Sequence, residues 1–489
     1  MESDDETGRD EPSGANAAAI FDLDRTLLSG ASGPIIGEAL RHVGLLTTPS
    51  GPLESIAFGV FNLIGETWPS MLVTRQGARA ARGWSVDLVQ AAAERAAEPL
   101  AEAVLPYARR MIDEHRRSGR TLVMATTTPE DLIRPMAEHL GFDDVIATRY
   151  GRRAGYYDGS IDGDFVWGKG KARAVAEWAN RRGIDLDVSY AYSDSYYDIP
   201  LLSIVGHPRA VNPDPRMLAL ATLRRWPVVH FDVPHGVPKF AGLEPQKALL
   251  LLAQPQLFPW MRLDIDGAEL IPRHGPAVLV ANHRSYIDPI AIGFLLARAG
   301  RPVRFLGKKE VFDAPVVGDV VSALGGIRVD RGTGSDEPLR AAQDALAAGE
   351  LVAIMPQGTI PRGPAFFDPV LQGRWGAVKL AEAAEVPIIP IGLWGTEKVW
   401  PRSAKLPNLT NVLDPPTVRI RVGPAVQLKH RSVDADTRRM MKAISALLPD
   451  EAREPHEPTE EELARTYPGG VVPDGVDAEH EATRRPGTD

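Results

Sequence analysis

Residues 277–289 read AVLVANHRSYIDP, an apolar run that passes directly into a polar segment. The apolar run predicts a buried strand that ends where the polar residues begin. His283 and Asp288 are five positions apart, which on a helix would turn their side chains roughly 140° apart, so the two can meet only across a turn. A histidine oriented by a carboxylate is the general-base arrangement that activates a hydroxyl group. Asp288 followed by Pro289 also fits a helix start with a carboxylate cap, and this segment by itself favours neither interpretation.

The composition is that of a soluble globular protein with more than one domain. The chain has 489 residues, of which 44% are hydrophobic and 24% charged, so two or three domains are expected. Its net charge of -9 argues against a nucleic-acid partner. The absence of cysteine excludes disulfides, a thiol nucleophile and cysteine metal sites, and suits a reducing compartment. No apolar run reaches the roughly 20 residues of a membrane-spanning helix. We therefore expect a cytoplasmic protein that is peripheral on the inner face of the cell membrane.

Strands alternate with helices twice along the chain, which predicts two α/β domains with parallel sheets. The predicted division is a disordered tail at 1–16, a first domain at 17–232 with a helical segment at about 34–115, a linker at 233–260, a second domain at 261–448 and an acidic disordered tail at 449–489. The linker contains an apolar helix around 248–252. Together with Phe258 and Trp260, this helix either lies on a membrane surface or packs on one of the domains.

Polar residues follow successive strands of the first domain, where the carboxyl ends of parallel strands converge on one crevice. They are Asp22 and Asp24, Thr126, Lys171 at the head of a helix, and Asp194 with Asp198. Carboxylates can hold a hard cation such as Mg²⁺, which needs few protein oxygens when it also binds phosphate. A hydroxyl and an ammonium supply the hydrogen bonds and charge that a transferring phosphoryl group requires. One aspartate can act as nucleophile and form an aspartyl-phosphate.

These residues, in this order, resemble the haloacid dehalogenase superfamily over residues 17 to about 218, specifically its phosphoserine-phosphatase-like branch. The resemblance implies a Rossmann-like parallel sheet with a helical cap. It implies Asp22 as the nucleophile and Asp24 as the general acid and base of a phosphatase. The implied ligands of Mg²⁺ are Asp22, Asp24, Asp194 and Asp198. The implied phosphoryl-binding residues are Thr126 and Lys171.

The substrate of this first domain is expected to be a small phosphate ester. In phosphoserine phosphatases a glutamate shortly after the first aspartates meets the substrate amine. Here residues 28–33 read LSGASG, without an acid. This departure argues against phosphoserine as the substrate.

Three further signals follow His283 in the second domain. They are a short strand at 325–331 that ends in Arg331, a turn with Gly358 and Thr359, and a proline-punctuated apolar strand at 386–391. Arg331 offers a fixed, charged fork for phosphate. Gly358 and Thr359 offer close backbone approach and a hydroxyl. Each signal alone also has a structural explanation, as a surface charge, a turn or an edge strand.

Together with His283 and Asp288, these signals resemble the four ordered motifs of the glycerolipid acyltransferases, of the lysophosphatidate acyltransferase type, over about 263–448. The resemblance implies that His283 removes the proton from a hydroxyl of a lysophospholipid while Asp288 orients the imidazole. The oxygen would attack the thioester of acyl-CoA or acyl-carrier protein. The implied acceptor site consists of Arg331, Gly358 and Thr359. A basic patch is implied, more weakly, at Lys308 and Lys309.

The third motif departs from the family pattern. It normally reads Pro-Glu-Gly-Thr followed by Arg, whereas Gln357 stands here for the glutamate and Ile360 for the arginine. Gln357 keeps hydrogen-bonding capacity without the charge, and Arg362 is a possible substitute for the missing arginine. An acceptor other than lysophosphatidate, such as another lysophospholipid or a glycolipid, is therefore an open alternative.

The resulting hypothesis is a bifunctional enzyme of phospholipid synthesis. Its acyltransferase domain would acylate a lysophospholipid at a membrane surface, and its phosphatase domain would hydrolyse a phosphate ester. The alternative hypothesis makes the phosphatase the main activity, with the acyltransferase-like half serving as a lipid-binding module. A scaffold without enzymatic activity is disfavoured, because both halves retain the core catalytic residue types.

Overall fold

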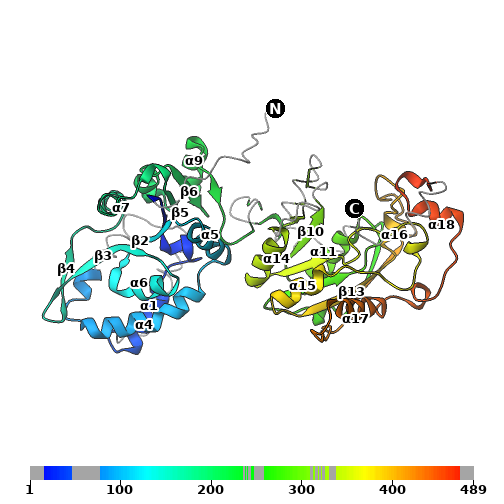
Figure 1. Ribbon diagram of the computed structural model, residues 1–489, viewed down its shortest axis with the longest axis horizontal. Helices are drawn as coiled ribbons and strands as arrows, with labels where there is room; N and C mark the ends of the chain where they lie inside the picture. The colour runs from blue at the N-terminus through cyan, green and yellow to red at the C-terminus, as the bar shows by residue number, and fades with distance from the viewer. Residues whose placement is uncertain are drawn as a thin grey trace. The chain divides into compact units, whose positions relative to one another are not determined.

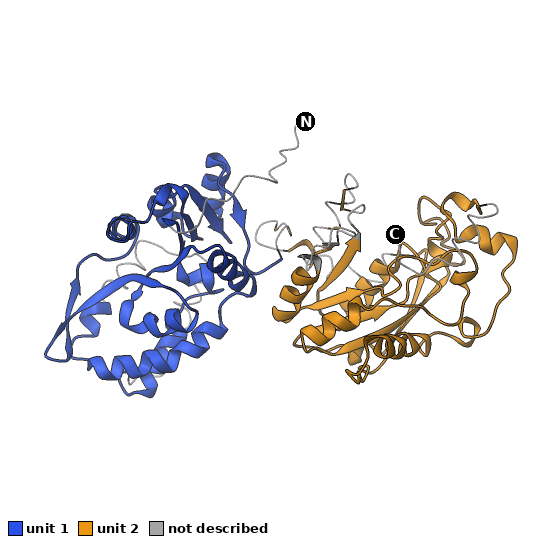
Figure 2. Cartoon of the chain, viewed as in Figure 1, with its two compact units in different colours: residues 1–235 blue, residues 236–489 orange. Residues whose placement is uncertain are grey.

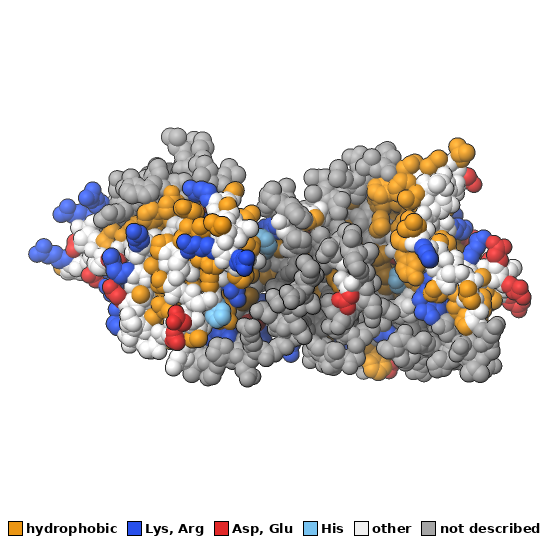
Figure 3. Space-filling view, turned by 90° about the horizontal axis from the view of Figure 1, so that it is seen from above, with side chains coloured by type: hydrophobic (Ala, Val, Ile, Leu, Met, Phe, Trp, Pro, Cys, Tyr) orange, Lys and Arg blue, Asp and Glu red, His pale blue; other side chains and the backbone are white. Residues whose placement is uncertain are grey.

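The chain forms two compact units, residues 1–235 and 236–489, each described by itself (Figure 2). The computed structural model describes residues 16–46, 77–234, 237, 239, 244–246, 258–308, 312–313, 318, 321, 325–329 and 337–473. Both units are α/β domains with mostly parallel sheets, which confirms the predicted fold class. On the face of each unit seen in Figure 3, exposed hydrophobic side chains lie among lysine and arginine side chains. No helix in the described part of the chain is long and apolar enough to cross a membrane.

The first unit is built on a seven-stranded sheet in the order β4-β3-β2-β1-β5-β6-β7, in which only the edge strand β4 is antiparallel to its neighbour. The strands are β1 Ala18–Phe21, β2 Thr121–Pro129, β3 Asp144–Arg153, β4 Tyr156–Asp162, β5 Tyr190–Ser193, β6 His207–Val211 and β7 Val228–Val229. Phe21, the last residue of β1, pairs with Met124 of β2 and Tyr192 of β5. The central strands therefore end side by side.

Helices cover both faces of this sheet because β1 is fully buried and its side chains alternate between two cores. The helices are α1 Gly33–His42, α4 Val86–Glu102, α5 Pro106–Arg117, α6 Glu130–His139, α7 Lys169–Arg182, α8 Ile199–Leu202 and α9 Pro215–Arg224 (Figure 1). Ala19 and Phe21 pack in the core with α1, α4, α5 and α6, whereas Ala18 and Ile20 pack in the core with α7, α8 and α9.

The predicted helical cap at 34–115 is partly described. It contains α1, α4 and most of α5, while residues 47–76 lie outside the described residues. Ile112 of α5 belongs to the same core as Leu122 of β2, and α5 leads directly into that strand. The structure therefore corrects the end of the cap region, because α5 is a crossover helix of the sheet.

The second unit is built on a seven-stranded sheet in the order β11-β10-β12-β9-β13-β14-β8. The strands are β8 Arg262–Asp266, β9 Ala277–Ala281, β10 Val303–Lys308, β11 Ile327–Val329, β12 Leu351–Ile354, β13 Ile388–Trp394 and β14 Thr417–Val422. All pairings are parallel except that of β13 with β14. The fully buried strand β9 coincides with the apolar run that the sequence predicted as a strand.

Helices again lie on both faces of the second sheet. They are α11 Asp288–Ala299, α14 Glu337–Ala347, α15 Gly376–Ala383, α16 Thr396–Val399, α17 Val433–Ser445 and α18 Glu460–Arg465. Leu279 of β9 packs in one core with α11, and Val278 and Val280 pack in the opposite core with α14, α15 and α17. Strand β9 is thus held on both faces, and in its polar continuation Asn282, Ser285 and Asp288 are buried as well.

The C-terminal segment at 449–473 is folded, which corrects the disordered tail predicted there. Thr459 and Glu462 form a capping box at the start of α18. Three glutamates occupy the first turn, where negative charge is favoured by the helix dipole, so the acidic run starts a helix. Thr466 accepts a hydrogen bond from the Gly363 backbone at 2.8 Å, and Tyr467 is buried. Residues 1–15 and 474–489 lie outside the described residues.

The end of the linker packs on the second unit. Phe258 meets Phe294 of α11 edge-on at a centroid distance of 4.5 Å, and Trp260 packs on the same core. For Phe258 and Trp260 the domain-packing alternative therefore holds. The apolar helix predicted around 248–252 lies outside the described residues.

A buried ion-pair network joins Arg304 of β10 to Glu244, before the strand in the sequence, and to Glu350, just before β12. Arg304 is almost completely buried and pairs with Glu244, and its other nitrogens contact Glu350 at 2.6 and 2.8 Å. Burial by itself lowers the pKa of the guanidinium, but the ion pairs with Glu350 and Glu244 outweigh it and raise the pKa of Arg304 above its ordinary value. Removal of the guanidinium would take the ion pairs with Arg304 away from two carboxylates.

We expect Arg304→Ala to lower the free energy of unfolding by about 3–5 kcal/mol, because it strands buried negative charge. Chemical denaturation measures the change. The control Arg465→Ala, which breaks an exposed pair with Glu461, should cost no more than about 1 kcal/mol. Combining Arg304→Met with Glu244→Gln and Glu350→Gln should recover most of the loss. Equal costs for Arg304→Ala and Arg465→Ala would contradict the role of the network.

Candidate active sites

The first site lies at the carboxyl ends of β1 and β5, opposite the start of α7 (Figure 1). Asp22 directly follows β1, and the fully buried Lys171 is in the first turn of α7. The Lys171 ammonium lies 2.8 Å from Asp22 Oδ1 and 2.7 Å from Asp198 Oδ2. Asp198 Oδ2 also accepts a hydrogen bond from the Ser193 hydroxyl at 2.8 Å. The structure thus brings together three of the predicted residues.

The backbone that leads Lys171 into this position has no room for a side chain. A Cβ atom at Gly170 would lie 2.3 Å from the carbonyl oxygen of Phe165, closer than such contacts occur. Gly168, immediately before α7, has a positive φ of 54°. The Gly-Lys-Gly-Lys sequence is therefore explained by the tight start of α7, which directs Lys171 at the aspartates.

Asp194 is joined to Asp22 by a threonine that the sequence analysis did not single out. The Thr26 hydroxyl lies 3.4 Å from Asp22 Oδ2 and 3.2 Å from Asp194 Oδ1, and it accepts a hydrogen bond from the Asp194 backbone at 3.0 Å. Arg25 approaches Asp194 Oδ2 at 3.1 Å from a left-handed turn with φ of 61°. The spacing of Thr26, four residues after Asp22, was the available signal.

Asp24 points to a different set of partners. Its carboxylate accepts hydrogen bonds from the Ser32 backbone and from the Thr128 hydroxyl, the latter at 3.3 Å. Burial raises the pKa of Asp24 above its ordinary value, although these hydrogen bonds act in the opposite direction. A carboxyl group with a raised pKa is suited to donate a proton. Ser32 and Thr128 were not predicted, and the run of three threonines at 126–128 was the signal for the second.

Thr126 itself is buried in β2, and its hydroxyl accepts a hydrogen bond from the Thr128 backbone at 3.2 Å. The neighbouring Thr127 hydroxyl donates to the Val166 carbonyl at 3.0 Å. Thr126 therefore shapes the end of β2 near the residue that contacts Asp24. Its predicted contact with a phosphoryl group stays a prediction.

The donor set of this site fits a magnesium ion. Among the described residues no group of three or more acidic or histidine side chains is arranged as a metal cluster. Mg²⁺, however, commonly uses one or two carboxylates and completes its shell with water and phosphate. Asp22 and Asp194 share the Thr26 hydroxyl, and the second oxygen of buried Asp198 has no hydrogen-bond partner in the described structure. Asp22 and Asp194 are thus the most suitable pair, with Asp198 beside them.

The second site begins at the carboxyl end of β9. His283 Nδ1 lies 2.7 Å from Asp288 Oδ2, so the two side chains meet across a turn as predicted. The same Asp288 oxygen accepts hydrogen bonds from the backbone of Arg284 at 2.7 Å and of Ser285 at 2.8 Å. Asp288 is fully buried, whereas 18% of the His283 side chain is exposed. With Nδ1 held by a carboxylate, Nε2 is the nitrogen left to accept a proton.

Asp288 does not cap helix α11, which corrects the alternative interpretation of this segment. The helix begins at Asp288 with Ile287 at the N-cap position and no side-chain cap, and Pro289 is in the first turn. The Asp288 carboxylate instead points back along the chain, where Oδ2 makes hydrogen bonds with His283 Nδ1 and with the backbone N–H groups of Arg284 and Ser285. Asp288 is therefore both the first residue of α11 and the residue that orients His283, and its side chain makes no capping hydrogen bond.

Gln357 holds the backbone of His283 in place through a hydrogen bond. Its side-chain oxygen accepts a hydrogen bond from the His283 backbone at 2.7 Å, and the side chain is 4% exposed. The preceding residue, Asn282, bonds both the N–H and the carbonyl of Leu393 in β13 at 2.7 and 2.8 Å. The neutral amide of Gln357 thus makes a contact that needs only an acceptor oxygen.

The other predicted acceptor-site residues are placed unevenly. Gly358 has a positive φ of 75°, and Thr359 is half-buried next to it in the turn after β12. Ile360 is buried, so this position offers no charge, and Arg362 is half-buried before the turn Gly363–Phe366. Arg331, Lys309 and the Lys308 side chain lie outside what the structure describes.

Arg284 was missed by the sequence analysis. Its guanidinium stacks between Phe366 and Trp394, at 4.2 and 4.1 Å from the ring centroids, and lies 3.2 Å from Glu397. It ties the His283 segment to the turn Gly363–Phe366 and to the end of β13. No pattern in the sequence distinguishes Arg284 from a surface arginine.

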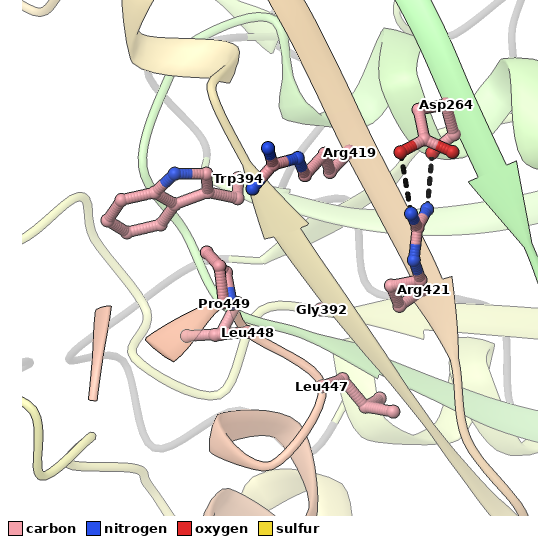
Figure 4. A pocket seen from close by; sticks show the side chains of 8 residues that line it. All are labelled: Asp264, Gly392, Trp394, Arg419, Arg421, Leu447, Leu448 and Pro449. Atoms are coloured by element: carbon pink, nitrogen blue, oxygen red, sulfur yellow. Dashed lines mark hydrogen bonds and ion pairs between the residues drawn. The ribbon is translucent and has the colours of Figure 1, made fainter. Parts of the chain in front are cut away.

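A cavity of about 360 Å³ is lined by residues of β13, β14 and β8 and by residues 447–449 (Figure 4). Its lining residues are Asp264, Gly392, Trp394, Arg419, Arg421, Leu447, Leu448 and Pro449. Arg421 is paired with Asp264 at 2.6 Å, as the dashed lines in Figure 4 show. None of the predicted acyltransferase residues lines this cavity, so it is distinct from the His283 site.

Comparisons with known proteins agree with the division of the chain into two units. A family model described as haloacid dehalogenase-like hydrolase matches residues 19–203, and one described as acyltransferase matches residues 262–394. The inhibition of morphological differentiation protein of Streptomyces azureus is 34% identical over 248 residues, which cover 48% of this chain and 87% of that protein. Phosphoserine phosphatase SerB1 of Mycobacterium tuberculosis is 34% identical over 245 residues, which cover 48% of this chain and 79% of that protein.

A solved structure also resembles part of the chain. The 1-acyl-sn-glycerophosphate acyltransferase PlsC of Thermotoga maritima is 23% identical, covers 41% of this chain and 78% of its own, and has a TM-score of 0.31. The two family matches fall on separate units, and the curated relatives are matched over most of their length. The chain therefore belongs to the haloacid dehalogenase-like hydrolases and is an enzyme that fuses a phosphatase-type domain of that family to an acyltransferase-family domain.

Proposed function

We propose that the second unit transfers a fatty acyl group from acyl-CoA or acyl-carrier protein to the free hydroxyl of a lysophospholipid of the lysophosphatidate type. The observation that carries this proposal is the His283–Asp288 contact of 2.7 Å, with the aspartate buried and the histidine partly exposed. A buried carboxylate fixes the tautomer that leaves Nε2 unprotonated, which is the form a general base requires.

The residue types that the proposed reaction needs are all present in this unit. His283 Nε2 takes the proton of the acceptor hydroxyl as that oxygen attacks the thioester carbonyl. The new C–O bond forms, the C–S bond breaks, and the thiolate leaves with the proton returned by the imidazolium. Asp288 stabilises the transient positive charge on His283. Arg331 would bind the phosphate of the acceptor, and the turn with Gly358 and Thr359 would approach it through backbone and hydroxyl.

The substitution of Gln357 for the family glutamate is compatible with this chemistry. The side-chain oxygen holds the His283 backbone, and a glutamine supplies that oxygen as well as a glutamate does. The loss of charge at Gln357 and Ile360 bears on which acceptor is used, so another lysophospholipid or a glycolipid stays a candidate. We place the reaction at the inner face of the cell membrane.

We expect His283→Ala to lower thiol release from acyl-CoA in the presence of lysophosphatidate by about 10²–10⁴-fold, because the base is lost. His274→Ala, at an exposed histidine of the same unit, is the matched control and should keep the wild-type rate. Release of thiol at the wild-type rate by His283→Ala would refute the proposed base. Binding of lipid by the wild type with no thiol release would favour the alternative, in which the second unit only binds lipid.

We propose that the first unit hydrolyses a small phosphate ester with Mg²⁺ as cofactor. Asp22 attacks phosphorus and the ester oxygen leaves with a proton from Asp24, and the resulting aspartyl-phosphate is hydrolysed by water that Asp24 deprotonates. Lys171 neutralises Asp22 and the phosphoryl oxygens. A bound Mg²⁺ at Asp22 and Asp194 would supply charge stabilisation for the transferring group.

Asp22→Asn should abolish magnesium-dependent hydrolysis of an aryl phosphate, a loss of at least about 10³-fold, because an amide does not attack phosphorus. The release of aryl alcohol measures it. Asp187→Asn, at an exposed aspartate of the same unit, should retain full activity. Hydrolysis by Asp22→Asn at the wild-type rate would exclude Asp22 as the nucleophile.

The raised pKa of Asp24 yields a prediction on pH dependence. The Thr128 hydroxyl stabilises the ionised carboxylate and so lowers the pKa, which means that Thr128→Val should raise the pKa of Asp24 further. The alkaline limb of the rate profile for an alkyl phosphate, whose leaving oxygen requires a proton, should move upward by about 0.5–1 pH unit. Thr127→Val is the control, because its hydroxyl bonds Val166 instead. A downward shift in Thr128→Val would contradict the assignment of Asp24.

A further inference from the structure

An exposed apolar loop borders the His283 site. Residues 400–416 connect α16 to β14, and we call them the 400–416 loop. Four of its aliphatic side chains are unusually exposed: Leu406 at 76%, Leu409 at 49%, Val412 at 50% and Leu413 at 95%. Leucine and valine exposed in one short segment mark a surface that is covered by a partner.

The loop carries Arg402, Lys405 and one acidic residue, Asp414, whose side chain is 96% exposed, and Lys398 lies in α16 just before it. Lys398 and Lys405 are exposed, and in the described structure neither forms an ion pair. The loop therefore presents aliphatic side chains together with cationic ones, the combination that suits a surface with anionic headgroups over an apolar interior.

The first residues of the loop are hydrogen-bonded to two segments of the acyltransferase site, one after His283 and one after Gln357. The Ser285 hydroxyl donates to the Trp400 carbonyl at 2.6 Å, and the Tyr286 and Trp400 rings meet at 5.6 Å. On the other side, the Arg402 guanidinium donates to the Ile360 carbonyl, three residues after Gln357. The first residues of the loop are thereby fixed to the segment that follows His283 and to the segment that follows Gln357.

The C-terminal segment adds to the same surface. The Ser403 backbone donates to the Arg465 carbonyl at 3.3 Å, and a Cβ at Gly470 would lie 3.7 Å from Ser403 Cβ. The next two residues, Val471 and Val472, are 72% and 40% exposed. Two segments that are distant in the sequence thus place exposed aliphatic residues around one loop base.

We propose that the 400–416 loop, together with Val471 and Val472, inserts into the surface of an anionic phospholipid bilayer. A protein partner fits less well, because the residues that carry most of the binding energy in protein interfaces are enriched in Trp, Tyr and Arg, and leucine and valine are under-represented among them. Insertion beside His283 would present the base to an acceptor lipid that stays in the membrane. That consequence rests on the proposed acyl transfer, but the insertion itself does not.

Co-sedimentation of the full chain with vesicles tests the insertion without any substrate. The wild type should bind vesicles of phosphatidylcholine mixed with phosphatidylglycerol more tightly than phosphatidylcholine alone. Leu406→Ser combined with Leu413→Ser should weaken binding to the mixed vesicles at least about tenfold, because two side chains lose their apolar environment. The matched control is Leu218→Ser combined with Leu223→Ser, at exposed leucines of α9 in the first unit, and it should bind as the wild type does.

The charged part of the proposal has its own variant. Lys398→Gln combined with Lys405→Gln should weaken binding to mixed vesicles by about fivefold per lysine and leave binding to phosphatidylcholine unchanged. Wild-type affinity in the Leu406/Leu413 variant would overturn the proposal. The absence of vesicle binding by the wild type would also overturn the proposal. This outcome includes the case in which the loop binds an acidic protein, such as acyl-carrier protein, in place of a membrane.

The His283→Ala variant separates this inference from the proposed reaction. It should bind vesicles as the wild type does while thiol release is lost. The Leu406/Leu413 variant should keep thiol release with a short-chain, monomeric lysolipid and lose at least about tenfold with an acceptor embedded in vesicles. Vesicle binding without thiol release by the wild type would refute acyl transfer and leave the insertion standing.

Discussion

A strand that is buried on both faces offers polar chemistry only at its ends, and both units are organised by this constraint. β1 and β9 are each enclosed by neighbouring strands and by helices on either side, so their side chains are apolar throughout. Parallel neighbours end at the same edge, and residues from several strands therefore meet there. Asp22 and His283 follow the central strand of their unit by one and two positions. The remaining site residues are brought to them by the sheet.

The two sites solve different electrostatic problems. The first gathers Asp22, Asp24, Asp194 and Asp198 around Lys171 and Arg25, so negative charge is in excess of positive charge. A buried excess of this kind is relieved by a bound cation or by a retained proton, and the raised pKa of Asp24 is consistent with the second. The second site buries the Asp288 carboxylate, and Oδ2 of that carboxylate makes three hydrogen bonds, to the His283 imidazole and to two backbone N–H groups. The other oxygen, Oδ1, is buried and has no hydrogen-bond partner among the described residues.

Residues to which no step of the chemistry is assigned hold both arrangements in place. Thr26 links Asp22 to Asp194, and Gln357 fixes the backbone of His283. Arg284, stacked between two aromatic rings, joins the histidine segment to the turn Gly363–Phe366 and to β13. Since such contacts set angles and distances at the reacting groups, their loss is expected to affect rate more than stability. The folded C-terminal segment belongs to the same supporting structure, because it bonds the backbone of Gly363.

The sequence by itself determined the fold class and the residues at the ends of the strands. Apolar runs at 277–281 and 351–354 became β9 and β12 with those bounds, because burial on both faces is written into a short stretch of the chain. What only the tertiary structure decided depends on residues that are distant in the sequence, such as Thr26 with Asp194 and His283 with Gln357. The contact of the folded segment after 449 with the Gly363 backbone is of the same kind, whereas the direction of the Asp288 carboxylate is set by residues three to five positions before it. Local periodicity records whether a side chain is buried, whereas its hydrogen-bond partner is selected only when the packed strands and helices fix which donors lie within reach.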